Sequence, residues 1–188
     1  MTESGARWLT IPVKASLAAA TPIDEVRVAD PTWSERHVSA IRNSYRHAAA
    51  FKTVSPWLLA QLEGVAREEL LTVINHRLLL ALAGKLGITT KLIPCTALID
   101  RRNLIEMQPN ERLLALCEAV GATRYLSGPA AKSYLDIEVF GAKGIDVAWM
   151  SYEGYPSYPQ LSHEFDPYLS IIDLLLNVGE QAAGYFPE

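Results

Sequence analysis

The chain has 188 residues, of which 49% are hydrophobic and 20% are charged, and its net charge is −4 with a pI of about 5.6. This composition excludes a disordered chain, and the length suffices for one domain with a proper core. The acidic balance, with Lys and Arg scattered rather than clustered, argues against a nucleic-acid-binding surface.

The N-terminal residues MTESGARW lack the basic region and the apolar run of a secretory signal. The longest uninterrupted apolar run, residues 78–83, is too short to span a bilayer, so we predict a cytoplasmic protein without a membrane span. Cys95 and Cys117 lie in apolar surroundings, which favours buried free thiols over a disulfide or a metal pair. The four histidines have no metal-ligand spacing, so no metal site is predicted.

The first quarter of the chain predicts two strands and a helix. Apolar and polar residues alternate over 7–13 and again over 23–29, which is typical of strands. A helix is then expected from about residue 30 to 47, with His37 on or beside its apolar face. That face consists of Trp33, Val38, Ile41 and Tyr45.

Two further helices are expected before residue 90. After a break at residues 50–55, the dipeptide Ser55-Pro56 predicts a helix start, because Ser caps helices and Pro suits the first helical position. The longest helix is predicted over residues 68–86, with Gly87 as the left-handed residue that ends it.

Strands and helices alternate in the second half. Strands are expected over 89–95, 123–127 and 145–150, and a helix begins at Pro109 after a loop over 96–108. Such alternation indicates parallel pairing. The predicted fold class is therefore α/β, with a three-layer-like mixed or mostly parallel sheet flanked by helices, in a single domain spanning residues 1–188.

The first polar cluster lies where a strand turns into a short helix. Ser127 ends the strand, Gly128 makes the turn, and Lys132 follows one helical turn later. Backbone N–H groups at such a turn can hold an anion. Alternatively, this is a plain strand-to-helix turn that needs Gly for its backbone.

The second cluster lies in a segment that Pro156 and Pro159 stiffen into an extended form. Its members are Tyr155, Tyr158, Gln160 and His163. Tyr and Gln each offer a donor and an acceptor, which suits hydroxyl-rich ligands. Alternatively, the tyrosines pack beneath a long loop.

The third cluster is a polar stripe on an apolar helix. Ser170, Asp173 and Asn177 are spaced by three and four residues, so they share one face. Ser170 and Asp173 have the spacing of a capping box, which leaves Asn177 unexplained. A carboxylate on a buried helix needs partners or a shifted pKa, so the stripe predicts either an internal polar site or a satisfied structural network.

Several segments together resemble one family. The run FDPYLSIIDLLLNVG, preceded by YPQ, resembles the C-terminal hallmark of the WbqC-like family of bacterial proteins. The run SGPAAKSYL, residues 127–135, resembles its internal S-G-x-x-x-K-x-Y-L segment. Further matches are Asn75 with the later LGI, the helix with Trp33, His37 and Tyr45, and the strand from Trp8 to Val13. The resemblance covers nearly the whole chain.

The sequence departs from the family at its beginning. Family members usually start upstream with a strand and a segment similar to H-Q-P-x-Y-x-P-W-x-G-Y, and this sequence starts just before the strand at Trp8. A fragment, a mis-started reading frame and a truncated homologue are the alternatives, and in each the first strand is expected to lack its partner.

The resemblance implies a role in the synthesis of bacterial surface polysaccharides, because the family is associated with gene clusters for O-antigen, a part of lipopolysaccharide, and for related polysaccharides. It implies a transferase-like enzyme acting on an amino- or nucleotide-sugar, in which Asp173 is the acid/base group or orients one, and His37 is a second proton-transfer group. The residues expected to bind the substrate are Ser127, Gly128, Lys132, Tyr134, Tyr158, Gln160, Ser170, Asn177 and Asn75. We expect the clusters to converge on Asp173.

The alternative is a non-catalytic or degenerate small-molecule-binding homologue. The missing upstream segment and the lack of a strong catalytic motif favour it. The sequence identifies neither a cofactor nor an oligomeric state.

Overall fold

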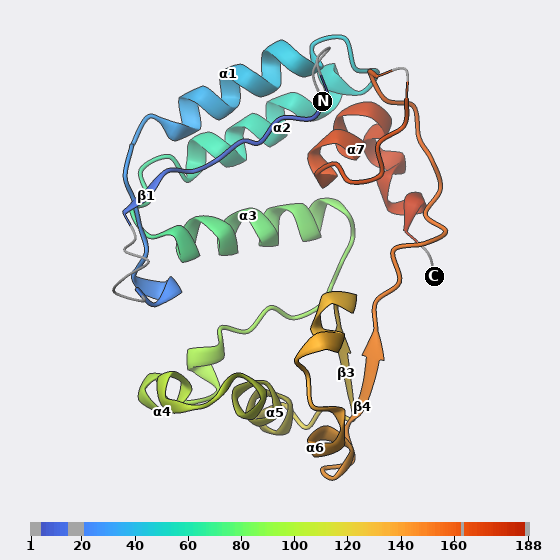
Figure 1. Cartoon of the computed structure of the whole chain (residues 1–188). Coiled ribbons are helices and arrows are strands. Elements are labelled where there is room, and N and C mark those ends of the chain that lie inside the picture. The colour runs from blue at the N-terminus through green and yellow to red at the C-terminus, as the bar shows by residue number, and fades with distance from the viewer. Residues whose placement is uncertain (1–4, 15–20, 163, 187–188) are drawn as a thin grey trace. The chain divides into compact units, whose positions relative to one another are not determined.

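The computed structural model describes residues 5–14, 21–162 and 164–186 (Figure 1). The chain divides into two compact units: the first comprises Met1–Thr89 and Tyr155–Glu188, and the second comprises Thr90–Gly154. The single domain expected for residues 1–188 stays a prediction.

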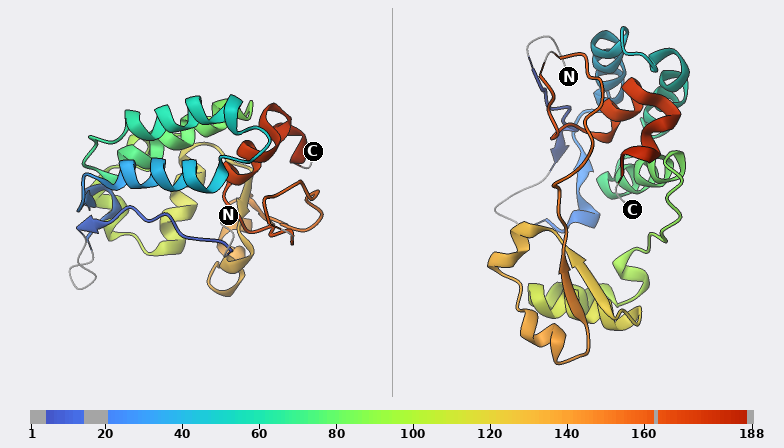
Figure 2. Two further views of the ribbon diagram at one scale, coloured as in Figure 1. Left: turned by 90° about the horizontal axis from the view of Figure 1, so that it is seen from above. Right: turned by 90° about the vertical axis from the view of Figure 1, so that its right-hand side faces the viewer.

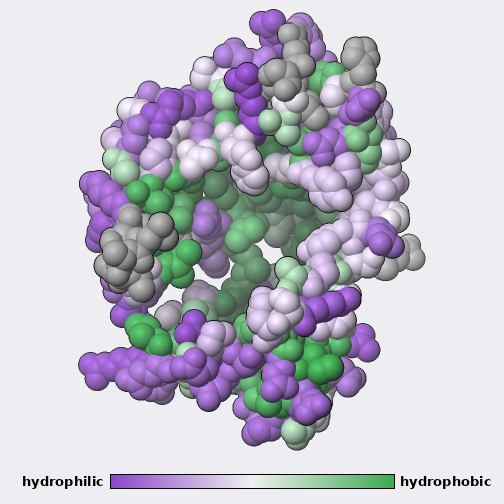
Figure 3. All heavy atoms as spheres, viewed as in Figure 1, coloured by the Kyte–Doolittle hydropathy of each residue, from purple (hydrophilic) through white to green (hydrophobic). Residues whose placement is uncertain are grey.

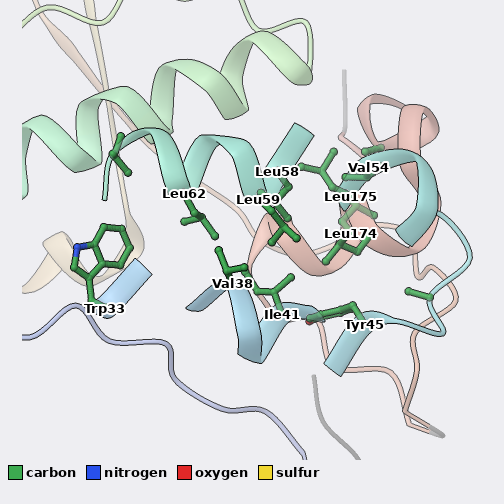
Figure 4. Close-up of a cluster of buried hydrophobic side chains, with 14 of the residues drawn as sticks. Trp33, Val38, Ile41, Tyr45, Val54, Leu58, Leu59, Leu62, Leu174 and Leu175 are labelled. Carbon is green, nitrogen blue, oxygen red and sulfur yellow. The ribbon is translucent and has the colours of Figure 1, made fainter. Parts of the chain in front are cut away.

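The first unit is built from helices. They are α1 (Trp33–Tyr45), α2 (Phe51–Gly64), α3 (Leu71–Lys85) and α7 (Ile171–Val178), and a 3-10 helix follows over Gly179–Tyr185. Helices α1 and α2 lie side by side in every view, and α7 packs against α2 (Figure 2). Figure 4 shows apolar side chains from α1, α2 and α7 meeting in one core. The last segment of the chain thus completes a core that the first half begins.

The predicted first helix is confirmed as α1, and its apolar face is buried. A turn at Asp30 precedes it: Oδ1 of Asp30 accepts hydrogen bonds from the backbone N and the hydroxyl of Thr32. Arg36 pairs with the other carboxylate oxygen. The hydrogen bond from the Thr32 hydroxyl, followed by that from Arg36, lowers the pKa of Asp30 to about 2.

Helix α2 begins at Phe51, five residues before Pro56, which was predicted as its first residue. The backbone N of Ala50 donates to the carbonyl of Leu176, and the carbonyl of Ala50 accepts from the backbone N of Val54. Contact with α7 therefore fixes the start of α2, which sequence spacing cannot show. Pro56 lies inside the helix, so the carbonyl of Lys52 lacks its helical donor.

Helix α3 ends as predicted at Gly87, whose φ is +72°. The backbone N of Ile88 donates to the carbonyl of Ala83, and the backbone N of Gly87 donates to the carbonyl of Gly84. These two bonds form a Schellman motif, which requires a left-handed residue at Gly87.

Replacing Gly87 by Ala is expected to lower the free energy of unfolding by about 1 kcal/mol, because a Cβ disfavours positive φ. Gly84→Ala is the matched control: its φ is not left-handed and a Cβ there meets no atom within 4 Å. That change is expected to stabilise by about 0.5 kcal/mol. Urea denaturation followed by circular dichroism measures both, and equal effects at the two positions would contradict the assignment.

The two N-terminal strands are much shorter than predicted. They are β1 (Val13–Lys14) and β2 (Arg27–Val28), an antiparallel pair in which Val13 faces Val28. Residues 23–25 form a 3-10 helix, and Trp8 is 96% exposed. Alternation gives a segment an apolar face, but a strand also needs a neighbour that pairs with it along its length. Among the described residues, the pairing with β2 covers Val13 and Lys14 and is extended only by the hydrogen bond from the backbone N of Ala29 to the carbonyl of Pro12.

The second unit combines short helices with one pair of strands. Its elements are α4 (Arg101–Glu106), α5 (Pro109–Ala119), β3 (Arg124–Ser127), α6 (Ile137–Gly141) and β4 (Asp146–Trp149). Strands β3 and β4 pair in parallel with Arg124 opposite Asp146, which confirms the predicted parallel pairing here. Their core includes Phe140, whose ring stacks on Tyr125 at 5.4 Å. Figure 3 shows hydrophobic residues interspersed with hydrophilic ones on the visible surface of this unit.

Two predictions for the second unit are wrong. Residues 89–95 form no strand, because all of them are exposed and nothing buries an apolar face. The predicted loop over 96–108 contains α4, which Asp100 caps by accepting a hydrogen bond from the backbone N of Arg102 at 2.8 Å. Both cysteines are free thiols, but Cys95 is exposed and only Cys117 is buried.

The protein is therefore a mixture of helices and strands, as expected. The described residues form two separate two-stranded sheets, one antiparallel and one parallel, and not the single flanked sheet that was predicted. None of the helices in the described ranges is both long enough and apolar enough to cross a membrane.

Candidate functional site

The candidate site is centred on Asp173, in the first turn of α7. Ser170 caps this helix, since its hydroxyl accepts a hydrogen bond from the backbone N of Ile172 at 3.4 Å. The Asp173 side chain is only 1% exposed, and the three leucines after it are buried as well. The apolar residues of α7 pack into the core of the first unit, and the Asp173 carboxylate is buried with them because it lies on the same helix.

Two tyrosine hydroxyls hold the Asp173 carboxylate. The Tyr45 hydroxyl, at the end of α1, donates to Oδ1 at 2.7 Å, and the Tyr158 hydroxyl donates to Oδ2 at 2.9 Å. Burial, and then the hydrogen bond to Asp173, raises the pKa of Tyr45 well above its ordinary value. Burial also raises the pKa of Tyr158, with the nearby Asp173 charge acting in the same direction. Both phenols therefore stay protonated at neutral pH and can donate to the carboxylate.

Gln160 shapes the segment that carries Tyr158. Its side-chain nitrogen donates to the carbonyl of Asp166 at 2.9 Å, and its side-chain oxygen accepts from the backbone N of Asp166 at 2.8 Å. The rings of Phe165 and Tyr185 pack edge-on against Tyr158 at 5.3 and 5.8 Å. By bonding the backbone of Asp166, Gln160 fixes the fold of the segment that carries Tyr158. His163 lies outside the described residues.

Asn177 completes the stripe predicted on α7. Its side-chain nitrogen donates to the carbonyl of Asp173 at 2.9 Å, one helical turn earlier, and its side chain is 8% exposed. Asp173 and Asn177 are therefore joined and buried in the core, whereas Ser170 is the exposed cap of the helix. The sequence placed Tyr45 on the apolar face of its helix and did not predict it as a site residue. The only sign of a further role was the family pattern that contains Trp33, His37 and Tyr45.

His37 lies apart from Asp173 on α1. It precedes Tyr45 by eight residues, which is about 12 Å along a helix axis. Its Nε2 lies 3.2 Å from the carbonyl of Thr10, so that nitrogen carries a proton, and its ring meets Trp33 edge-on at 5.1 Å. Burial lowers the pKa of His37, with the Thr10 carbonyl acting in the opposite direction. A proton-transfer role for His37 stays a prediction.

The lowered pKa of His37 predicts acid sensitivity. Below its ordinary pKa of 6.5 the unfolded chain takes up a proton at this position and the folded chain does not. The free energy of unfolding should therefore fall as the pH drops from 6.5 through the lowered pKa, and this contribution is fully present above 6.5. Chemical denaturation at pH 5 to 8 measures this slope, and His37→Gln should flatten it. An unchanged slope in that variant would contradict the assignment.

The second unit carries four of the predicted ligand-binding residues. Ser127 ends β3 and Gly128 follows it, but the next element is a 3-10 helix that begins at Pro129. Pro129 has no N–H, so the turn offers fewer donors to an anion than predicted. The Lys132 ammonium lies over the Trp149 ring, 5.6 Å from its centroid, in a cation–π contact.

Two other predicted binding residues are exposed. Tyr134 is 61% exposed in the second unit, and Asn75 is exposed on α3. The structure thus brings together Asp173, Asn177 and Tyr158, and Gln160 lies in the segment that carries Tyr158, while Ser170 caps α7 from an exposed position. Convergence of the remaining residues on Asp173 stays a prediction. Among the described residues, no group of three His, Cys, Asp or Glu side chains is arranged to hold a metal ion.

Comparisons with known proteins agree with the sequence resemblance. A family model described as the WbqC-like protein family matches residues 1–185. The chain is 37% identical over 186 residues to the uncharacterized protein Rv1507c of Mycobacterium tuberculosis, covering 98% of this chain and 77% of that protein. No solved structure matches the chain.

Proposed function

Because the chain belongs to the WbqC-like protein family, we propose that it is a transferase-like enzyme of bacterial surface-polysaccharide biosynthesis, acting on an amino- or nucleotide-sugar of the kind used for O-antigen. The observation that carries the proposal is a carboxylate that is 1% exposed and joined to the half-buried Tyr158 hydroxyl. A buried carboxylate that is hydrogen-bonded to a partly exposed phenol can exchange a proton with a substrate through that phenol.

The proposed chemistry is a proton relay. A substrate hydroxyl gives its proton to the Tyr158 oxygen while the Tyr158 proton moves to Oδ2 of Asp173. The substrate oxygen then forms a bond to the transferred group, and the leaving group departs with the electron pair of the bond that breaks. Tyr158 ends neutral and Asp173 ends protonated, and the proton returns to the leaving group by the same route.

The raised pKa of Tyr158 explains why the relay needs both groups. A phenol with a raised pKa does not give up its proton at neutral pH unless another base accepts it at the same time. Asp173 is such a base, but it is too buried to meet a substrate directly. Tyr45 holds the other carboxylate oxygen and orients it.

The remaining polar residues take binding roles in this proposal. Asn177 and Gln160 support the network, and both contribute to recognition of sugar hydroxyls. The anionic part of the substrate is assigned to Ser127, Gly128 and Lys132. Tyr134, Ser170 and Asn75 are further proposed contacts, and His37 is the second proton-transfer group.

The test is a thermal-shift screen against nucleotide sugars and acyl donors, followed by turnover assays on the ligands that bind. Asp173→Asn and Tyr158→Phe should each lower kcat by about 100- to 10 000-fold, because each interrupts the relay. Tyr45→Phe is the matched control: it removes the same kind of hydrogen bond from the other carboxylate oxygen and should cost less. An Asp173→Asn variant with unchanged Tm and full activity would overturn the proposal.

A non-catalytic binding protein is the second candidate. Hydrogen bonds within the protein already engage both Asp173 oxygens, the Gln160 amide and the Asn177 nitrogen, which is also the pattern of a structural network. The same screen separates the two candidates. Ligand binding without turnover, in both this chain and the longer Mycobacterium tuberculosis relative, favours the second.

A further inference from the structure

A groove of 540 Å³ lies between the end of α1 and helix α2. It is lined by Arg42, Asn43, Arg46, Phe51, Ser55, Pro56, Leu59, Ala60 and Glu63. All of these residues belong to the first unit, and neither Asp173 nor its two tyrosines is among them. The groove is therefore a site separate from the proposed relay.

Two arginines give the groove its charge. Arg42 and Arg46 are four residues apart, so both side chains project from the same side of α1. No carboxylate among the described residues lies within ion-pair distance of either one. Nε of Arg46 donates to Nε2 of His47 at 3.0 Å, which orients that guanidinium. Two unpaired guanidinium groups at one place attract an anion.

A buried hydroxyl faces the same groove. Ser55 is only 7% exposed, and among the described residues its side chain has no hydrogen-bond partner. The Ser55 oxygen is not among the fully buried unpartnered atoms of the described residues, so it is accessible from the groove, where it can donate a hydrogen bond to an oxygen of a ligand. Ser55 thus adds a hydroxyl donor beside the two guanidinium groups.

Apolar side chains and one carboxylate form the rest of the lining. Phe51, Pro56 and Leu59 offer a surface to the body of a ligand. Glu63 accepts hydrogen bonds and repels a second anionic group. The lining therefore fits a molecule with one anionic end and an uncharged, partly apolar body.

We propose that this groove binds the phosphoryl group of a small phosphomonoester. Each guanidinium presents paired N–H donors that match phosphate oxygens, and the Ser55 hydroxyl donates to a third oxygen. The uncharged body of the ester lies against Phe51, Pro56 and Leu59. This site is distinct from the proposed transfer reaction, and its test needs no turnover.

Isothermal titration calorimetry with phenyl phosphate, inorganic phosphate and the uncharged benzyl alcohol tests the proposal on the full chain. Phenyl phosphate should bind more tightly than inorganic phosphate, because only the ester contacts the apolar lining, and benzyl alcohol should not bind. Arg42→Gln with Arg46→Gln should weaken phenyl phosphate binding at least tenfold, and Ser55→Ala should weaken it severalfold.

The matched control is Lys14→Gln with Arg67→Gln, which removes two exposed positive charges outside the groove. It should leave the affinity within about twofold at 0.15 M salt, where distant charges are screened. Equal weakening in both double variants would show only a general effect of net charge and would overturn the proposal. Absence of binding to the unmodified chain at about 10 mM phenyl phosphate would overturn it as well.

Discussion

Replacing Asp173 by Ala should lower the free energy of unfolding by about 2 to 5 kcal/mol. The change removes the acceptor of two hydroxyls, and an unpartnered buried donor costs about 1 to 3 kcal/mol. Tyr45 is buried and Tyr158 half-buried, so water replaces the lost acceptor poorly at Tyr45 and better at Tyr158. Urea denaturation monitored by tryptophan fluorescence measures the loss.

Two variants separate the hydrogen bonds from the packing around Asp173. Asp173→Asn keeps the shape and one acceptor oxygen, so its loss should be smaller than that of Asp173→Ala. Combining Asp173→Ala with Tyr45→Phe should cost less than the sum of the single changes, because the Phe variant no longer buries an unpartnered hydroxyl. Strict additivity in this cycle would contradict a direct Tyr45–Asp173 hydrogen bond.

Replacing Leu176 by Ala should lower the free energy of unfolding by about 2 to 5 kcal/mol. Leu176 is fully buried where α7 meets the core of α1 and α2, and its carbonyl accepts the hydrogen bond from Ala50 that fixes the start of α2. The smaller side chain leaves a cavity that the surrounding helices fill only in part.

Leu79→Ala is the matched control, since Leu79 is 56% exposed on α3. The same chemical change there should alter the free energy of unfolding by less than about 0.5 kcal/mol. Urea denaturation of both variants gives the comparison. A Leu176→Ala loss no larger than that of Leu79→Ala would contradict the packing of α7 in the core.

Local patterns predicted the elements whose causes are local. The helical spacing of Trp33, Val38, Ile41 and Tyr45 predicted α1, and the glycines after α3 and α5 ended those helices with left-handed backbone. The parallel pair β3 and β4 followed from alternating strands and helices. For α1 and for the two helix ends, residues within a few positions supply the apolar face or the hydrogen bonds, whereas β3 and β4 pair over a separation of 22 residues (Arg124 opposite Asp146).

Other elements depend on residues far apart in the sequence. The run at 7–13 has the alternation of a strand, but in the described part of the chain its strand pairing begins at Val13, the last residue of the run, which lies opposite Val28. Ser55-Pro56 resembles a helix start, yet a contact with Leu176 begins α2 at Phe51. Alternation and capping preferences show which strands or helix ends a segment is able to form. Hydrogen bonds to distant segments decide which of these actually form.

For the candidate site, the sequence by itself determined that Asp173 and Asn177 share one face of a buried helix that Ser170 caps, because the spacing of four residues follows from helix geometry. It also fixed the family. Only the tertiary structure decided that Tyr45, 128 residues away, holds one oxygen of Asp173 and Tyr158 the other. The physical reason is that a buried carboxylate must find donors, and their identity depends on how α1, α7 and the proline-rich segment pack together.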